Sequence, residues 1–212
     1  MKFNLVLLHI VTLAFLHTMQ LQAQQRNFQS ETWLGANAGA TASMVWFRPT
    51  VNQSYLLGYN AGLTFRHISE KNLGVQAEIN YSQRGYTELS GNYSRRMDYL
   101  ELPFLTHIYF GNKVQFFIQL GPKLGYFIGD EVLINQGGSN ATHRQLAVSN
   151  KFDYGLSGGF GLQFVAAKQS FQLYTRANYS VSNFFPDRTI DYFDNSNHMN
   201  ASVSLSWLMR VK

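Results

Sequence analysis

Histidines are the side chains of this sequence best suited to general acid–base chemistry. His107, His143 and His198 are each available as a base beside one of many serines, the arrangement that an acyl hydrolase requires. None of the three stands in a motif that fixes a base beside a nucleophile. We therefore predict no catalytic residue. A lipid A-modifying acyl hydrolase stays open as a less favoured alternative.

Metal and nucleic-acid sites are not expected either. The sequence has no cysteine, which removes thiolate ligands and disulfides. Asp187, Asp191 and Asp194 do not match the spacing of a calcium-binding loop, so no metal or cofactor is predicted. The net charge of +5 is scattered along the chain, whereas a nucleic-acid binder clusters its basic residues on one face.

Charged side chains instead fall at alternate positions of apolar segments, where they face an interior. This inward set is Arg66, Glu78, Arg84, Glu101, Lys123, Asp153, Arg176 and Arg210. We predict two structural ion pairs, Glu78 with Arg176 across the interior, and Glu101 with Lys123. The second pair lies directly opposite on neighbouring strands if Asn112 is the centre of their hairpin. Buried charges persist only when paired, so these pairs would close the interior; the alternative is charges solvated in a water-filled interior.

The elements that position these charges are strands. Residues 99–129 alternate apolar and polar side chains on both sides of a short turn at 111–113, which indicates a β-hairpin. Each arm sustains the alternation for at least the roughly 9–11 residues that a tilted membrane-crossing strand needs. We therefore place the apolar face against lipid. Eight such segments cover residues 34–43, 57–66, 73–82, 100–110, 114–128, 152–164, 171–181 and 200–210.

Connections between the segments alternate in length. Short turns are predicted at 69–72, 111–113 and 166–169, and long polar connections at 44–54, 85–98, 130–151 and 183–198. Short turns at one end and long loops at the other are typical of bacterial outer-membrane barrels. The sequence predicts an all-β protein, an eight-stranded up-and-down antiparallel transmembrane β-barrel whose long loops face outward.

Aromatic side chains support this fold, because amphipathic rings gather at both membrane interfaces. The row predicted near the short turns is Trp33, Phe65, Phe110, Phe116, Phe164, Phe171 and Trp207. The row predicted near the long loops is Tyr59, Tyr81, Tyr126, Tyr154 and Tyr179.

The N-terminal segment reads as a targeting signal. Lys2, a short apolar core and the small residue Ala23 before a polar stretch predict a secretory signal peptide over 1–23. A short lead over 24–31 and a barrel domain over 32–212 follow. The expected location is the bacterial outer membrane after cleavage of the signal peptide.

Several short motifs resemble those of a known family. The motifs are Tyr99-Leu100-Glu101-Leu102-Pro103, Tyr109-Phe110-Gly111, Gly121-Pro122-Lys123-Leu124-Gly125-Tyr126, Phe152-Asp153-Tyr154-Gly155 and Gly158-Gly159-Phe160-Gly161. Together they resemble the outer-membrane β-barrel domain (PorT-like, porin family) common in Bacteroidetes. This resemblance implies an accessory role in protein secretion or envelope assembly.

The favoured role is non-enzymatic: a structural part of the membrane, or binding and adhesion through the outward loops. The residues proposed for loop contact are Phe184, Phe185, Tyr192 and Phe193, which stand among acidic residues. Expected partners are outer-membrane lipid, the barrel-assembly machinery and secretion or envelope proteins. The alternatives are the PorT-like accessory role and a soluble lipocalin-like carrier, whose apolar face would point inward.

Overall fold

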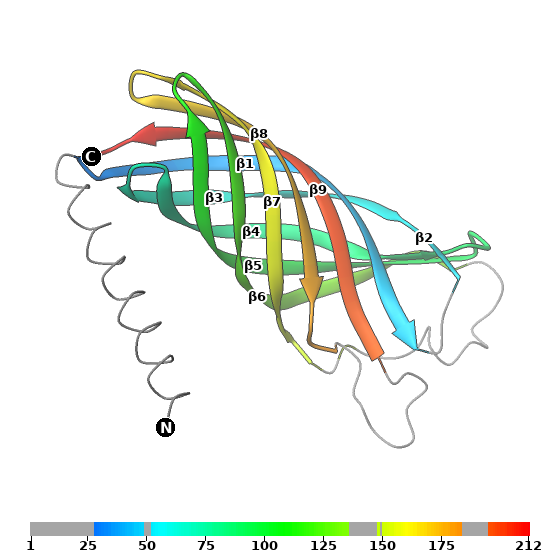
Figure 1. Ribbon diagram of the computed structural model, residues 1–212. Coiled ribbons are helices and arrows are strands. Elements are labelled where there is room, and N and C mark those ends of the chain that lie inside the picture. The colour runs from blue at the N-terminus through cyan, green and yellow to red at the C-terminus, as the bar shows by residue number, and fades with distance from the viewer. Residues whose placement is uncertain (1–27, 49–51, 136–147, 149, 184–194) are drawn as a thin grey trace, which may run out of the picture.

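The computed structural model describes residues 28–48, 52–135, 148, 150–183 and 195–212, and these residues form an antiparallel sheet (Figure 1). Its strands are β1 (Glu31–Arg48), β2 (Gln53–Ser54), β3 (Leu56–Glu70), β4 (Leu73–Glu88), β5 (Tyr93–Gly111), β6 (Val114–Asn135), β7 (Phe152–Ala166), β8 (Gln169–Ser180) and β9 (Asn195–Arg210). Among the described residues, no helix is long and apolar enough to cross a bilayer. The predicted all-β, antiparallel class is confirmed.

The strands follow the order β2-β4-β3-β1-β9-β8-β7-β6-β5, and a further pairing of β4 with β5 joins the ends of this order. Every strand except β2 therefore has at least two antiparallel neighbours. Figure 1 shows the turns and the C terminus at one end of the sheet, and β2 with the β4–β5 connection at the other. We call these the turn end and the loop end.

The structure has nine strands where the sequence predicted eight, because β2 was not foreseen. Gln53 lies opposite Glu88, whereas Asn60 on β3 lies opposite Ser82. The pairing of β2 is thus shifted by one residue from that of β3 along the same neighbour, β4. A one-residue irregularity of this kind interrupts the hydrogen-bond ladder, but the chain goes on to pair with the same neighbouring strand. β2 is therefore a short continuation of β3.

Connections at the turn end agree with the prediction, and those at the loop end are shorter than predicted. The predicted long connection over 85–98 is wrong: β4 continues to Glu88 and β5 begins at Tyr93. Residues 130–135 also belong to a strand, β6, instead of to a loop. Over 85–98 the polar-inward alternation changes because interior side chains such as Tyr86 and Met97 are apolar, and this hid the strands from the pattern.

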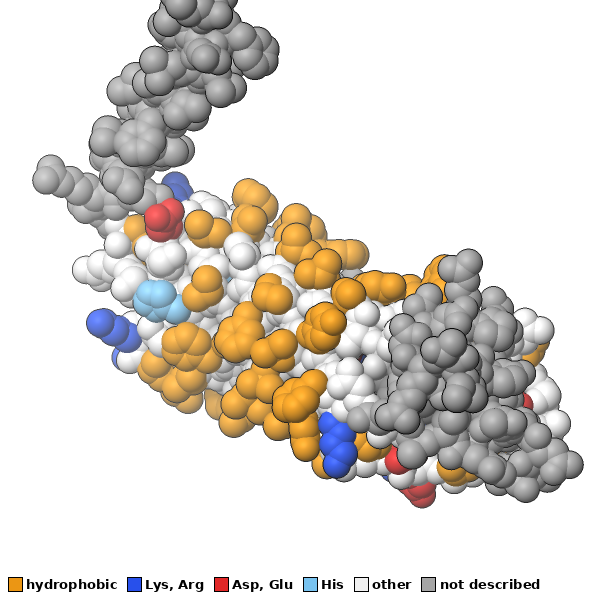
Figure 2. All heavy atoms as spheres, turned by 90° about the horizontal axis from the view of Figure 1, so that it is seen from below, with side chains coloured by type: hydrophobic (Ala, Val, Ile, Leu, Met, Phe, Trp, Pro, Cys, Tyr) orange, Lys and Arg blue, Asp and Glu red, His pale blue; other side chains and the backbone are white. Residues whose placement is uncertain are grey.

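Apolar side chains cover the outside of the sheet, as the sequence predicted. Leu57, Leu120 and Leu205 are 77%, 62% and 64% exposed, whereas polar residues at alternate positions are buried. Figure 2 shows hydrophobic side chains spread over the middle of one face, with charged side chains toward both of its ends. In water, so large an apolar surface is unfavourable.

The outward aromatic rows are present with one exception. Trp33 is wrong as a member of the turn-end row, because it is only 4% exposed and its neighbour Leu34 is 48% exposed. Since successive side chains of a strand point to opposite faces, Trp33 must point inward if Leu34 points outward. Trp33 packs there with Ile68 and Leu208.

Candidate functional site: a filled interior

The interior holds an ion pair at mid-height between β4 and β8. Arg176 donates from Nη1 to Glu78 Oε2 at 2.6 Å and from Nη2 to Oε1 at 2.8 Å. Both side chains are buried: Glu78 is 2% exposed and Arg176 is 5% exposed. Gln76 and Asn80 donate to the same carboxylate at 2.5 and 2.7 Å. The structure therefore brings together Glu78 and Arg176, and hydrogen bonds satisfy both carboxylate oxygens of Glu78.

A second group of charges lies nearer the loop end; we call Arg84, Glu101, Lys123 and Asp153 the upper charge cluster. Arg84 contacts Glu101 and donates from Nη1 to Asp153 Oδ2 at 2.6 Å. Lys123 Nζ donates to Asp153 Oδ2 and to Ser180 Oγ, both at 3.1 Å. Two cations thus balance two carboxylates, which is the condition under which buried charges are retained.

The predicted direct opposition of Glu101 and Lys123 is wrong. Glu101 lies opposite Gly125, and Lys123 lies opposite Pro103. Gly111 pairs with Gln115, so the centre of the turn is Lys113, one residue later than predicted. The Lys123 ammonium is still 4.0 Å from the Glu101 carboxylate, but Arg84 and Asp153 are the nearer partners. The sequence placed Arg84 and Asp153 inward without naming them as partners.

Little space remains between the two charged groups. A cavity of about 10 Å³ has both Glu101 and Arg176 in its lining, with amides and hydroxyls around them. A single water molecule needs roughly 10–15 Å³. At this height the side chains therefore fill the interior, which agrees with the width of small barrels.

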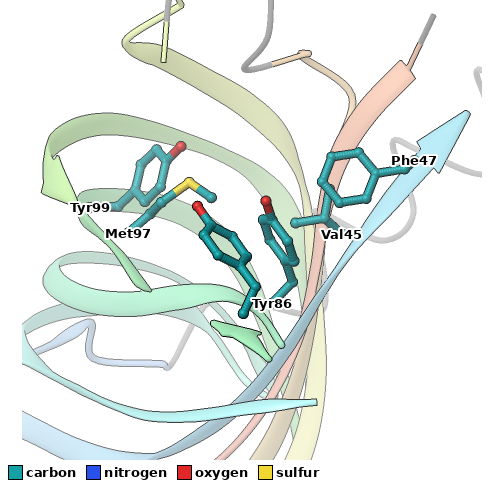
Figure 3. Packing of buried hydrophobic residues seen from close by; sticks show 6 residues of the cluster. Val45, Phe47, Tyr86, Met97 and Tyr99 are labelled. Carbon is teal, nitrogen blue, oxygen red and sulfur yellow. The ribbon is translucent and has the colours of Figure 1, made fainter. Parts of the chain in front are cut away.

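An apolar layer lies at the loop end, above the upper charge cluster. We call it the aromatic cap, and it consists of Val45, Phe47, Tyr86, Tyr93, Met97 and Tyr99. Figure 3 shows Tyr86, Met97 and Tyr99 gathered beside Val45 and Phe47. The rings of Phe47 and Tyr86 meet edge to face at 5.1 Å, and Tyr86 is 0% exposed.

The aromatic cap is in contact with the upper charge cluster. The Arg84 guanidinium lies 4.6 Å from the centre of the Tyr99 ring, which joins the cap to the charges below. All of the cap residues except Tyr99 fell within connections predicted at 44–54 and 85–98. Their signal was present, because Val45, Phe47, Met97 and Tyr99 keep the inward parity of the adjoining strands.

The amino-acid sequence of these strands matches that of a known family. A sequence model described as "Outer membrane protein beta-barrel domain" matches residues 22–186, more than half of the chain. The chain belongs to this outer-membrane β-barrel domain family. A comparison with curated protein sequences gives no match.

Solved structures of outer-membrane proteins have a similar fold. OprG from Pseudomonas aeruginosa aligns with a TM-score of 0.54 and 12% identity, over 88% of this chain and 98% of that chain. Neisserial surface protein A aligns with a TM-score of 0.47 and 11% identity, over 84% and 98%. Ail of Yersinia pestis aligns with a TM-score of 0.43 and 14% identity, over 84% and 99%. At this identity the likeness to OprG shows the fold alone.

Of the three histidines considered as bases, two are buried in the interior and the third lies outside the described residues. His107 is buried beside Phe117, with a ring distance of 5.0 Å, and hydrogen-bonds Gln119 at 3.1 Å. The placement of His198 in an outward loop is wrong, because it lies in β9 and is 2% exposed. Its Nε2 is 3.3 Å from the Tyr99 hydroxyl. His143 lies outside the described residues.

The predicted loop-contact residues are not described by the structure. Phe184, Phe185, Tyr192 and Phe193 all fall within 184–194. Within the described ranges, His, Asp and Glu side chains do not form a group of three or more suited to a metal ion. The site that the structure presents is therefore the packed interior.

Proposed function

We propose that this protein is an eight-stranded transmembrane barrel of the bacterial outer membrane, with β2 as a short addition. The closed order of pairings supports this architecture. Apart from β2, its strands have 12 to 22 residues, more than the roughly 9–11 that a crossing strand needs. The outward apolar side chains are the surface that acyl chains would cover, so outer-membrane lipid is the primary partner.

Export and assembly follow from this location. The signal peptide over 1–23 directs the chain across the inner membrane, and the barrel-assembly machinery inserts it with the turn end in the periplasm. The test is fractionation followed by electrophoresis with and without boiling. A band in the outer-membrane fraction that migrates differently after boiling agrees with the proposal. A monomer that is water-soluble without detergent would contradict it.

The proposed role is structural, or binding and adhesion at the loop end, and not solute conduction. The observation that carries this proposal is the filled interior: the central pair of Glu78 and Arg176, the upper charge cluster and the aromatic cap succeed one another along it. A wide aqueous pore would leave these charges solvated instead of paired.

Single-channel recording in a planar bilayer tests the closed interior. The wild-type protein is expected to give no stable conductance above the bilayer baseline. An Arg84→Ala variant removes the side chain that joins Glu101 to Asp153 but leaves the central pair and the aromatic cap in place, so it is also expected to give no stable conductance. Stable wild-type conductance would refute the proposal. An Arg96→Ala variant, which changes a partly exposed residue near the loop end, is the matched control.

The second candidate is a PorT-like accessory of secretion or envelope assembly, with a partner at the loop end. The motifs around Pro103, Gly121 and Gly158 support it, through their resemblance to that family. Affinity purification from outer membranes under mild detergent tests the idea. Recovery of secretion components favours it, and recovery of the barrel alone favours the structural role.

An enzymatic role is not favoured. His107 and His198 are enclosed among interior side chains, so neither can reach a lipid at the membrane face. An unchanged lipid A mass spectrum on expression is expected, and a mass shift would revive the hydrolase alternative. A lipocalin-like carrier is disfavoured because the interior holds the charges and the exterior the apolar side chains.

A further inference from the structure

The turn end of the barrel interior contains a pocket of about 140 Å³, which we call the terminal pocket. Its polar lining includes Glu31, Arg66, Tyr109, Ser170 and Arg210. It lies below the central ion pair and outside the groups that close the interior. We propose that the terminal pocket binds a phosphate group, with Arg66 as the main anchor.

Arg66 differs from the other buried cations of the described interior. Arg84, Lys123 and Arg176 each contact a carboxylate, whereas the partners of Arg66 are the neutral amides of Gln76 and Gln163. Arg66 is 2% exposed. The carboxylate of Glu78 acts on Arg66 only at longer range and is already paired with Arg176. A buried charge without a carboxylate in contact is costly, so the site favours the entry of an anion.

The hydrogen bonds of Arg66 leave part of its guanidinium unused. Nε donates to Gln76 Oε1 at 2.8 Å, and Nη1 donates to Gln163 Oε1 at 2.9 Å. Nη2 is buried without a hydrogen-bond partner among the described residues, and so is Ser170 Oγ. A guanidinium and a hydroxyl that line one pocket provide the donors that phosphate oxygens accept.

The charge of the pocket has the sign that phosphate needs. Arg210 Nη1 donates to Glu31 Oε1 at 2.6 Å, and Trp33 Nε1 donates to Glu31 Oε2 at 3.1 Å. Arg210 neutralises Glu31, so the positive charge of Arg66 is the net charge of the pocket lining. The volume of about 140 Å³ is also about ten times the roughly 10–15 Å³ that one water molecule needs, so a phosphate group fits.

Two sources carry this chemistry, inorganic phosphate in solution and the headgroup of an anionic phospholipid. The proposed orientation puts the turn end in the periplasm, where both are present, but the recognition by Arg66 does not depend on that orientation. The test therefore titrates inorganic phosphate into the full barrel in neutral detergent by calorimetry. A second arm compares thermal unfolding in nanodiscs of zwitterionic lipid with unfolding in nanodiscs that contain phosphatidylglycerol.

The variants are Arg66→Gln and Ser170→Ala, with Arg96→Gln as the control at the opposite end. Loss of one charge-assisted contact is expected to weaken phosphate binding by about tenfold or more for Arg66→Gln. Ser170→Ala is expected to weaken it less, and Arg96→Gln not at all. Should Arg66→Gln fail to show the heat-dependent gel shift of a folded barrel, Ser170→Ala carries the comparison.

Each result decides the proposal. Binding of dissolved phosphate that depends on Arg66 supports it with a soluble anion as ligand. An Arg66-dependent response to phosphatidylglycerol alone supports it with a lipid headgroup. No response in either arm up to about 10 mM phosphate, or equal binding by wild type and Arg66→Gln, overturns it. A folded barrel that binds no phosphate leaves the proposed closed interior intact, so the two proposals fail separately.

Discussion

Removal of the Glu78 carboxylate is the perturbation that tests the interior most directly. In the variant Glu78→Ala, the Arg176 guanidinium loses two hydrogen bonds, of 2.6 and 2.8 Å, and keeps the 2.8 Å bond to Gln119. Gln76 and Asn80 lose their acceptor as well. The charge of Arg176 then stays in a closed interior without a carboxylate beside it.

The expected loss of unfolding free energy follows from this geometry. Breaking a buried ion pair by removing one partner costs about 3–5 kcal/mol, since an uncompensated charge remains. Replacing both partners by apolar side chains of similar volume is often neutral. The double variant Glu78→Met, Arg176→Met is therefore expected to be more stable than Glu78→Ala. This non-additivity separates a true pair from two independently solvated charges.

Urea unfolding from lipid vesicles, followed by tryptophan fluorescence, measures these differences. The control is Arg96→Ala, because Arg96 is partly exposed and its partner Glu131 is 60% exposed; such pairs contribute about 0–1 kcal/mol. A loss below about 1 kcal/mol for Glu78→Ala, with additive effects in the double variant, would mean that water already solvates both charges.

Three further perturbations test the wall and its outer end. Leu63→Arg puts a charge on the outward face, where Leu63 is 66% exposed, and is expected to cost about 2 kcal/mol in bilayers by urea unfolding; a cost near zero would mean that water covers this face. Gly155→Val is expected to abolish the heat-dependent gel shift, because a Cβ there would lie 2.0 Å from a backbone oxygen of β8; Gly129→Ala, with nothing within 4 Å, should fold normally. Tyr86→Ala empties part of the aromatic cap, so trypsin is expected to cleave at Arg96 while the barrel stays folded; unchanged cleavage would show that the cap does not hold this region.

The sequence predicted the strands wherever one face is polar and the other apolar. Around Leu73–Ser82 the alternation is strict, and β4 occupies this range with its polar residues buried. A period of two is a local property, so it can be read without knowledge of the fold. The prediction failed at Tyr86 and Met97 for the same reason: apolar residues face inward there, and polarity no longer identifies the face.

Partners across the interior were harder to predict than faces. Glu78 on β4 and Arg176 on β8 stand half-way around the order of strands from each other, and equal height sufficed to match them. Arg84 and Asp153 come from β4 and β7, which are neither neighbours nor opposite. Their contact depends on the register of several hairpins, and an error of one residue at Lys113 already misplaced Lys123.

The charges along the interior are arranged differently at its two ends. The central pair and the upper charge cluster are each neutral, so neither attracts an ion that would have to be released for conduction. The aromatic cap then removes water from the loop end. Among the cations of the described interior, Arg66 in the terminal pocket is the one that contacts no carboxylate, and it lies at the end opposite to the cap. Under the two proposals above, water is excluded at the loop end and an anion enters from the turn end. The paired charges would then serve structure alone, and binding would be confined to the terminal pocket.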